Sequence, residues 1–177
     1  MKVCLFFDGK NFYTAMKSWD SNFKVNYNQL VKTIINRIKA DVVFNGAYYY
    51  VGTGPGSNLD SFINHLKLQP GYFVRTRERK HRTRKCPHCK EPIKYTEEKE
   101  VDTLMVSEMI QLAAQDAFDI AVLFSGDSDL VPAAESLRSL GKKVILATWG
   151  NRGLSKRLRE YAFDQIDLID LKEDIKK

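Results

Sequence analysis

Four aspartates stand where an α/β chain could assemble a metal-binding site. Asp127 and Asp129 follow the apolar run 120–124, which is typical of a strand buried on both faces. Asp8 follows a second run of this kind, and Asp102 opens a predicted helix. Because ligands of open α/β sheets bind outside the carboxyl ends of the strands, we expect the four carboxylates to gather at one sheet edge.

Carboxylates gathered in this way predict a divalent cation, since they cannot all stay ionised side by side without one. Oxygen ligands favour Mg²⁺ or Mn²⁺, which keep several waters and bind substrate phosphates. Such an ion activates a bound water and holds a scissile phosphate. Asn11 and Ser125 are polar neighbours that could line the same site. The alternatives are ordinary: Asp127 or Ser128 as a helix N-cap, Asn11 as a cap, and Asp8 as a turn residue.

One further acid lies within the apolar face of a predicted helix. Between Val101 and Gln115 the apolar residues recur at helical spacing, and Glu108 shares their face. A carboxylate packed against a sheet needs a partner, which would be a metal, a metal-bound water or a nearby basic group. We expect Glu108 to be largely buried and directed towards the acidic cluster.

A basic segment carries the whole net charge of the protein. The chain has 28 Lys and Arg against 22 Asp and Glu, a net charge of +6. Residues 75–99 contain ten of the bases and four of the acids, which leaves 18 of each elsewhere. A basic segment on a neutral body indicates a polyanionic partner, nucleic acid first; a solvated loop is the alternative. The candidate RNA-binding side chains are Arg75, Arg77, Arg79, Lys80, Arg82, Arg84 and Lys85.

The same segment contains Cys86-Pro87-His88-Cys89, which is half of a zinc-binding motif. A closed structural zinc site needs four ligands, and the chain has no second pair of this spacing. His81 is the candidate third ligand, with His88 or His65 as a fourth, and two copies of the chain sharing one ion are an alternative. A degenerate zinc ribbon or a surface turn with two free thiols would bind no metal. Cys4 is expected in the core.

The rest of the chain predicts strands that alternate with helices. Predicted strands span 3–7, 42–51, 72–76, 120–124, 144–148 and 166–169, and predicted helices span 26–39, 57–67, 101–115, 130–140 and 154–161. This alternation indicates a mostly parallel sheet with right-handed crossovers. Ser57 is a plausible N-cap, and the glycine-rich turn 52–56 lacks the lysine and the spacing of phosphate-binding loops.

Length and composition fit a single domain with one good core. The 177 residues are 44% hydrophobic, and no apolar run approaches the ~20 residues that span a bilayer. No signal peptide is visible, because Met1 leads straight into a predicted strand. Three cysteines argue against a disulfide framework and fit a reducing compartment, so we expect a cytoplasmic protein.

Three motifs together resemble the NYN domain, a PIN-like ribonuclease domain of the bacterial LabA-like group. They are Phe7-Asp8-Gly9-Lys10-Asn11, Lys99-Glu100-Val101-Asp102 and Ser125-Gly126-Asp127-Ser128-Asp129-Leu130-Val131-Pro132. The resemblance covers nearly the whole chain. It implies an α/β, Rossmann-like PIN/NYN three-layer sandwich with a mostly parallel central sheet, here with a basic CxxC-containing insert at 75–99. Two positions depart from the family pattern: Glu108 stands where Asp is common, and Glu100 where glycine is usual.

The resemblance also implies a Mg²⁺- or Mn²⁺-dependent ribonuclease, with RNA, single-stranded or structured, held by the basic segment. Its catalytic residues would be Asp8, Asn11, Asp102, Glu108, Asp127 and Asp129, with the four aspartates as metal ligands. A non-catalytic RNA-binding or regulatory module on the same fold is the alternative. A phosphatase or nucleotide hydrolase would share the carboxylate chemistry but explains the basic segment less well. No membrane partner is expected, and a second copy of the chain is a further candidate partner.

Overall fold

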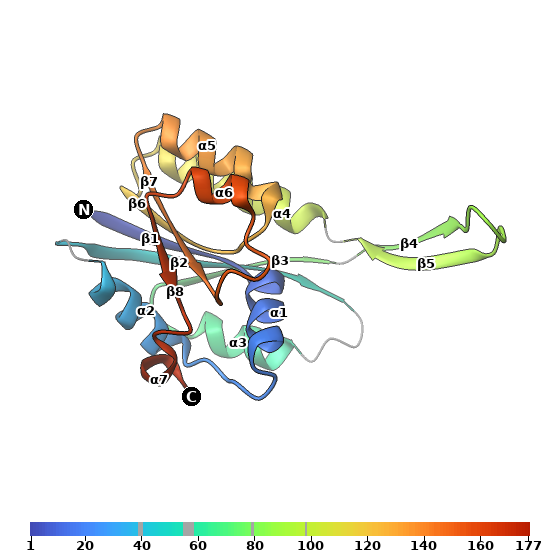
Figure 1. The fold of residues 1–177 in the computed structure, drawn as a ribbon, viewed down its shortest axis with the longest axis horizontal. Helices are drawn as coiled ribbons and strands as arrows, with labels where there is room; N and C mark the ends of the chain where they lie inside the picture. Colours follow the sequence, from blue (N-terminus) through green and yellow to red (C-terminus); the bar gives the residue numbers. More distant parts are fainter. Residues whose placement is uncertain (39–40, 55–58, 79, 98) are drawn as a thin grey trace.

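A central sheet of six parallel strands organises the molecule (Figure 1). The computed structural model describes residues 1–38, 41–54, 59–78, 80–97 and 99–177. The sheet strands are β1 (Lys2–Asp8), β2 (Val43–Thr53), β3 (Tyr72–Glu78), β6 (Ile120–Phe124), β7 (Lys143–Thr148) and β8 (Asp164–Asp167). Their order is β3-β2-β1-β6-β7-β8, and all neighbours run parallel. The strand order therefore reverses between β1 and β6, at the centre of the sheet.

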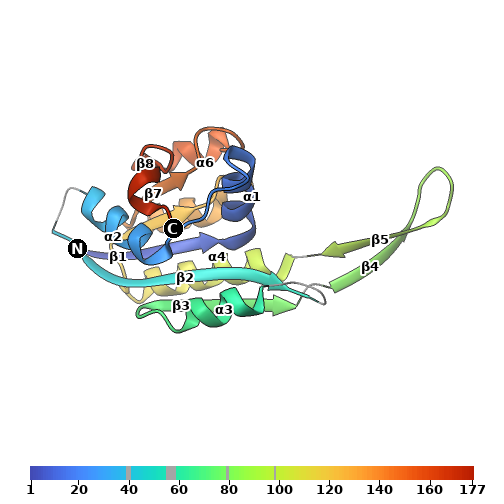
Figure 2. The same ribbon diagram turned by 90° about the horizontal axis from the view of Figure 1, so that it is seen from below.

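Helices cover both faces of the sheet and make three layers (Figure 2). One face carries α1 (Gly9–Trp19), α2 (Tyr27–Arg37), α3 (Asp60–Lys67) and α7 (Lys172–Ile175), and the other carries α4 (Lys99–Ala114), α5 (Val131–Ser139) and α6 (Lys156–Glu160). This arrangement confirms the predicted α/β fold. Among the described residues, no helix combines the length and the apolar character that a membrane crossing requires.

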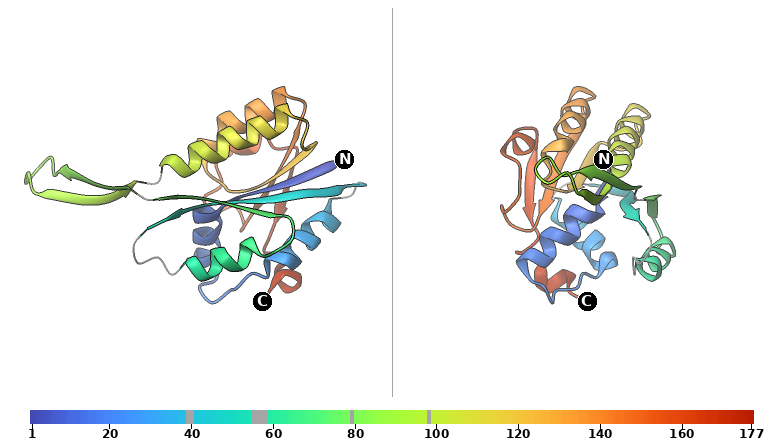
Figure 3. Two further views of the ribbon diagram at one scale, coloured as in Figure 1. Left: turned by 180° about the vertical axis from the view of Figure 1, so that it is seen from behind. Right: turned by 90° about the vertical axis from the view of Figure 1, so that its right-hand side faces the viewer.

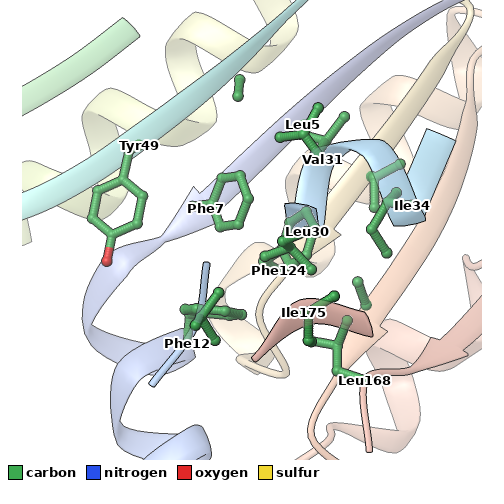
Figure 4. Packing of buried hydrophobic residues seen from close by; sticks show 14 of the residues in the cluster. Leu5, Phe7, Phe12, Leu30, Val31, Ile34, Tyr49, Phe124, Leu168 and Ile175 are labelled. Atoms are coloured by element: carbon green, nitrogen blue, oxygen red, sulfur yellow. The ribbon is translucent and has the colours of Figure 1, made fainter. Parts of the chain in front are cut away.

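Alternate residues of the buried strands enter two separate cores. On β1, Leu5 and Phe7 pack with α1 and α2, whereas Cys4 and Phe6 pack with α4 and α5. The Phe7 ring stacks on Phe124 of β6, with 3.9 Å between the ring centroids (Figure 4). Cys4 is fully buried, as expected, and burial raises the pKa of its thiol to about 11. The strands that carry the candidate site are thus held from both faces.

The basic segment forms a two-stranded arm that leaves the body of the protein (Figure 3). β4 (Lys80–Lys85) pairs antiparallel with β5 (Pro92–Glu97), and Cys86 to Glu91 make the turn at the tip. The arm joins the end of β3 to the start of α4. The arm at 80–97 is therefore shorter than the predicted insert at 75–99, because the two ends of that insert belong to β3 and α4.

Some element boundaries differ from the predicted ones. Helix α1 was not predicted, although its buried or partly buried apolar residues recur at helical spacing: Phe12, Ala15, Met16 and Trp19. β8 lies two residues earlier than the predicted strand 166–169. Helix α3 begins at Asp60 rather than at 57, and Ser57 lies outside the described residues.

Candidate active site

The topology brings Asp8 and Ser125 together at the point where the strand order reverses. β1 and β6 are neighbours in register, with Phe7 opposite Phe124, so Asp8 and Ser125 follow side by side at the carboxyl ends of the two strands. The Ser125 hydroxyl donates a hydrogen bond of 2.9 Å to Asp8 Oδ2. Both side chains are buried, and Asp8 is only 8% exposed. This is the crevice in which open α/β sheets bind their ligands.

The second oxygen of Asp8 fixes the start of helix α1. Asp8 is the N-cap, and its Oδ1 accepts the backbone N–H of Asn11 at 3.0 Å. Asn11 in turn accepts the backbone N–H of Gly126 on its Oδ1 at 3.2 Å. The ends of β1 and β6 and the first turn of α1 are therefore tied together by side chains of the predicted site.

Asp127 joins this network through Ser125 and caps the next turn. The Asp127 backbone N–H donates to Ser125 Oγ at 3.1 Å, and Asp127 Oδ1 accepts the Asp129 N–H at 3.0 Å. The capping role that was the alternative for Asp127 is therefore real, and Asp8, whose alternative was a turn residue, is a cap as well. These capping roles do not compete with ligand binding, because capping occupies one face of a carboxylate that has about four lone-pair sites. Asp129 itself is exposed.

The fold disfavours the ionised form of Asp8. Burial raises its pKa above the ordinary value, and the negative charge of Asp127 raises it further. The hydrogen bonds from Asn11 and Ser125 lower it and offset part of this effect. A cation placed beside Asp8 and Asp127 would relieve both the burial and the repulsion.

Two glycines allow neighbouring backbone to pass close to the acids. A Cβ on Gly9 would lie 2.6 Å from the Tyr50 carbonyl oxygen, and one on Gly126 would lie 2.8 Å from the Gly153 carbonyl oxygen. Both contacts are with backbone, which cannot turn aside as a side chain can. Glycine is therefore required after Asp8 and after Ser125, because other parts of the backbone pass too close there to leave room for a side chain.

Asp102 and Asp129 are more exposed than Asp8. Asp102 is exposed in the first turn of α4, which begins at the same end of the sheet (Figure 1). Across the described ranges, no three His, Cys, Asp or Glu side chains meet closely enough to form a ready metal site. Asp8 and Asp127 nevertheless fit Mg²⁺ or Mn²⁺, since these ions are commonly held by one or two carboxylates, waters and substrate phosphates.

Glu108 pairs with Arg75 and Tyr50 rather than with the candidate metal site. Its side chain is 17% exposed and forms a bidentate ion pair with Arg75 of β3, whose Nη2 lies 2.7 Å from Oε1 and whose Nε lies 3.0 Å from the same oxygen. The Tyr50 hydroxyl donates to Oε2 at 3.0 Å. Of the three partners considered for Glu108, the structure supplies the basic group. The same ion pair raises the pKa of Arg75 and engages this candidate RNA-binding residue.

Glu108→Gln is therefore expected to reduce stability rather than metal affinity. Arg75 would lose its counter-charge, and hydrogen bonds to charged groups contribute about 1.5–3 kcal/mol, less here because the Arg75 side chain is 37% exposed. Urea unfolding would measure the loss, and a Mn²⁺ titration would show whether affinity changes. Asp116→Asn, which removes the acid of the pair with Lys142, is the control; that carboxylate is 87% exposed, so the loss of stability should be smaller. A loss of Mn²⁺ affinity larger than the loss of stability would instead make Glu108 part of the site.

A cleft of about 460 Å³ adjoins the acids on the α1 side of the sheet. Asn11 and Ser125 line it together with the loop that follows β7. Its floor includes buried Trp149, and exposed Asn151 and Arg152 lie on its rim. These residues were not predicted, although the loop follows a buried strand and the strand-end rule that selected Asp8 applies to it equally.

The other predicted RNA-binding residues lie on β3 and along the arm. Arg77 is exposed on β3 and donates to its neighbour's backbone, the Thr76 carbonyl oxygen, at 3.0 Å. Arg84 and Lys85 are exposed near the tip. Lys80 and Arg82 belong to β4, and Arg79 lies outside the described residues.

The candidate zinc ligands are only partly brought together. Cys86 and Cys89 share the tip turn. His81 lies five residues before Cys86 in the sequence and belongs to β4. His65 belongs to α3, on the body of the protein.

Comparisons with known proteins agree with the fold and the motifs. Residues 2–169 match the NYN domain family. The chain is 28% identical over 180 residues to the low amplitude and bright protein LabA of Synechococcus elongatus, covering 99% of this chain and 88% of LabA. Its fold is similar to that of VPA0982, a protein of unknown function from Vibrio parahaemolyticus, with a TM-score of 0.70 at 18% identity, covering 99% of this chain and 96% of that one. Since the family match spans nearly the whole chain, the protein belongs to the NYN-domain family of PIN-like, nuclease-type domains.

Proposed function

We propose that this NYN domain hydrolyses RNA phosphodiester bonds at the site formed by Asp8 and Asp127, with Mg²⁺ or Mn²⁺ as cofactor. The observation that carries the proposal is the Asp8–Ser125–Asp127 network at the strand-order reversal. Burial and the negative charge of Asp127 both raise the pKa of Asp8 there. Such a pair has a chemical reason to bind a divalent cation, and RNA has the phosphates that complete the coordination of that ion.

Each residue of the network has a distinct part in this reaction. Asp8 and Asp127 would hold the ion, which when bound supplies an activated water and charge neutralisation at the phosphate. Ser125 and the Asn11 N–H fix both oxygens of Asp8. The carboxylate is therefore already oriented before the reaction and loses little conformational entropy during it. Asn11 is itself held by Gly126 and lines the cleft, where its amide can position the sugar–phosphate backbone.

The surroundings of the acids suit a nucleic-acid strand. The adjoining cleft has an apolar floor and a polar rim that includes Arg152, which fits a nucleotide next to the scissile phosphate. Asp102 and Asp129 are exposed at the same end of the fold and would act at the rim, through water or a second ion. The basic arm starts at this end of the sheet and extends the positive surface away from it.

A cleavage assay with and without chelator tests the proposal. Labelled single-stranded and stem-loop RNAs would be incubated with the protein in Mn²⁺, in Mg²⁺ and in EDTA. We expect cleavage with either ion and none in EDTA. A preparation of Asp8→Asn, purified in parallel, identifies any contaminating nuclease, because a contaminant would cleave in both preparations. Cleavage that survives EDTA, or that is equal in the two preparations, would contradict the proposal.

The second candidate function is a non-catalytic RNA-binding or regulatory module on the same fold. Its supporting observation is Glu108, whose carboxylate is engaged by Arg75 and Tyr50. Binding would then depend mainly on the arm and the cleft. RNA binding without cleavage in Mn²⁺ by protein that has bound the ion would favour this function.

In metal-free buffer, Asp8→Asn should stabilise the protein at pH 7. The pKa of Asp8 is raised in the fold, so the folded protein binds this proton more tightly than the unfolded chain does. The stability from this group is fully present below the unfolded pKa, near 4, and is lost as pH rises through the folded pKa. Asn caps a helix as well as Asp does, so the variant keeps the start of α1.

Urea unfolding in EDTA over a pH series measures this effect. Wild type should match the variant below about pH 4 and fall behind it towards pH 7. Asp41→Asn, an exposed position before β2 at the opposite sheet edge, is the control and should follow wild type throughout. An Asp8→Asn variant that is less stable than wild type at pH 7 would show that the carboxylate is favoured as an anion, contrary to the expected burial penalty.

A further inference from the structure

The tip of the basic arm has a turn shaped around two cysteines. The Cys86 N–H donates to the Glu91 carbonyl at 2.8 Å, and the Lys90 N–H donates to the Cys86 carbonyl at 3.0 Å. Lys90 has a φ of 63°, a left-handed conformation that few residues adopt. These bonds close a tight loop and bring Cys89 back beside Cys86.

Within that loop both cysteines carry free thiols, with Cys89 exposed and Cys86 partly exposed. The thiolate is the form of cysteine that binds metal. Two residues separate the cysteines, which is the spacing of a zinc-binding pair. The turn thus presents two sulfurs on one short loop, as half of a zinc site requires.

The described residues do not complete the coordination. Over the described parts of the chain, no third His, Cys, Asp or Glu joins the pair. Cys4 is buried in the core, and the arm carries the tip away from the body (Figures 1 and 2). Half of a tetrahedral zinc site is therefore displayed at the tip of the arm, where a second molecule can supply the rest.

We propose that two copies of this chain share one Zn²⁺ at their arm tips, each supplying Cys86 and Cys89. A two-fold axis through the ion makes the contact self-complementary, since the same pair of sulfurs comes from both sides. Four thiolates around Zn²⁺ leave a net negative charge, and exposed Lys85 and Lys90 flank the turn on each copy. This charge offsets the repulsion between two basic arms. The thiol protons released on binding pass to solvent.

The proposal is independent of RNA cleavage and gives the arm a second role. A dimer joined at the tips would hold two candidate active sites at a fixed separation along one continuous basic surface. The Asp8 network lies on the body and needs no contribution from the second copy. Zinc binding and phosphodiester hydrolysis can therefore succeed or fail separately.

Zinc content and molar mass, measured on the same full-length sample, test the shared site. We expect about half a Zn²⁺ per chain and a dimer by light scattering, with chelator returning the protein to a monomer and removing the zinc. Co²⁺ in place of Zn²⁺ should give the visible bands of a tetrahedral four-thiolate site. The double variant Cys86→Ser/Cys89→Ser should be a zinc-free monomer, while Cys4→Ala, which alters the only other cysteine, should keep both properties.

Several results would overturn this inference. One Zn²⁺ per monomeric chain would place all the ligands within a single copy. A dimer that persists in chelator or in the double cysteine variant would owe its assembly to another surface. Loss of zinc from His88→Ala would make the imidazole a ligand in place of a sulfur. Absence of zinc from protein refolded or dialysed with Zn²⁺ would leave the tip as a turn with free thiols.

Discussion

Asp127→Asn is expected to lower the rate of RNA cleavage by about 10²–10³-fold while leaving RNA affinity unchanged or slightly higher. The factor is that of removing one preorganised electrostatic contact from a transition state. The variant keeps the local fold, because Asn can accept the Asp129 N–H as Asp127 does, and the Asp127 backbone bond to Ser125 is untouched. Binding does not suffer, since a negative charge near the phosphate has been removed.

A thermal-shift measurement separates loss of metal from loss of catalysis. With Mn²⁺ at about 100 times its dissociation constant, wild type should gain about 2.7 kcal/mol, or roughly 5–10 °C in Tm for a chain of this size. Asp127→Asn should lose most of that gain, whereas Asp41→Asn, which makes the same charge change at the other sheet edge, should keep it. If Asp127→Asn cleaves RNA at the wild-type rate, the acids at the end of β1 and β6 are not the catalytic site.

The central part of the candidate site could be predicted from simple patterns in the sequence. Runs of apolar residues marked β1 and β6 as buried strands, and acids directly after them had to reach one sheet edge. The structure places Asp8 and Asp127 there, joined through Ser125. Such positions are predictable because the strand ends and the parallel topology determine where the backbone lies, and this does not depend on which partners the side chains choose.

What the sequence could not supply was the choice of partner for each side chain. Glu108 was expected to face the acids, but it pairs with Arg75, which comes from a strand 33 residues earlier. That pairing depends on β3 lying at the sheet edge beside β2, and helical periodicity carries no such long-range information. The arm was not predicted for a related reason. Among the described residues its two strands pair with each other and not with the central sheet, so they lack the apolar alternation that a buried face imposes.

Neutralising three bases of the arm should weaken RNA binding about a hundredfold at 0.1 M salt. Each phosphate contact to a single strand contributes about 0.7 to the slope of log affinity against log salt, so losing three contacts should flatten the slope by about 2. The variant is Arg82→Gln/Arg84→Gln/Lys85→Gln, which keeps Cys86 and Cys89 in place. Its matched control is Lys172→Gln/Lys176→Gln/Lys177→Gln, with the same charge change at and just beyond α7, where the chain ends away from the arm (Figure 1).

Filter binding over a salt series distinguishes the arm from the net charge of the protein. If steering by overall charge were responsible, both triple variants would lose affinity equally, since each removes three positive charges. Contacts made by the arm predict a loss confined to the arm variant, shrinking as salt approaches 1 M, where counterion release no longer contributes. Cleavage at saturating RNA should remain near the wild-type rate, because the arm neutralises phosphates at a distance from Asp8 and Asp127. An arm variant with unchanged affinity and slope would reduce β4 and β5 to a solvated extension and leave the cleft as the surface that binds RNA.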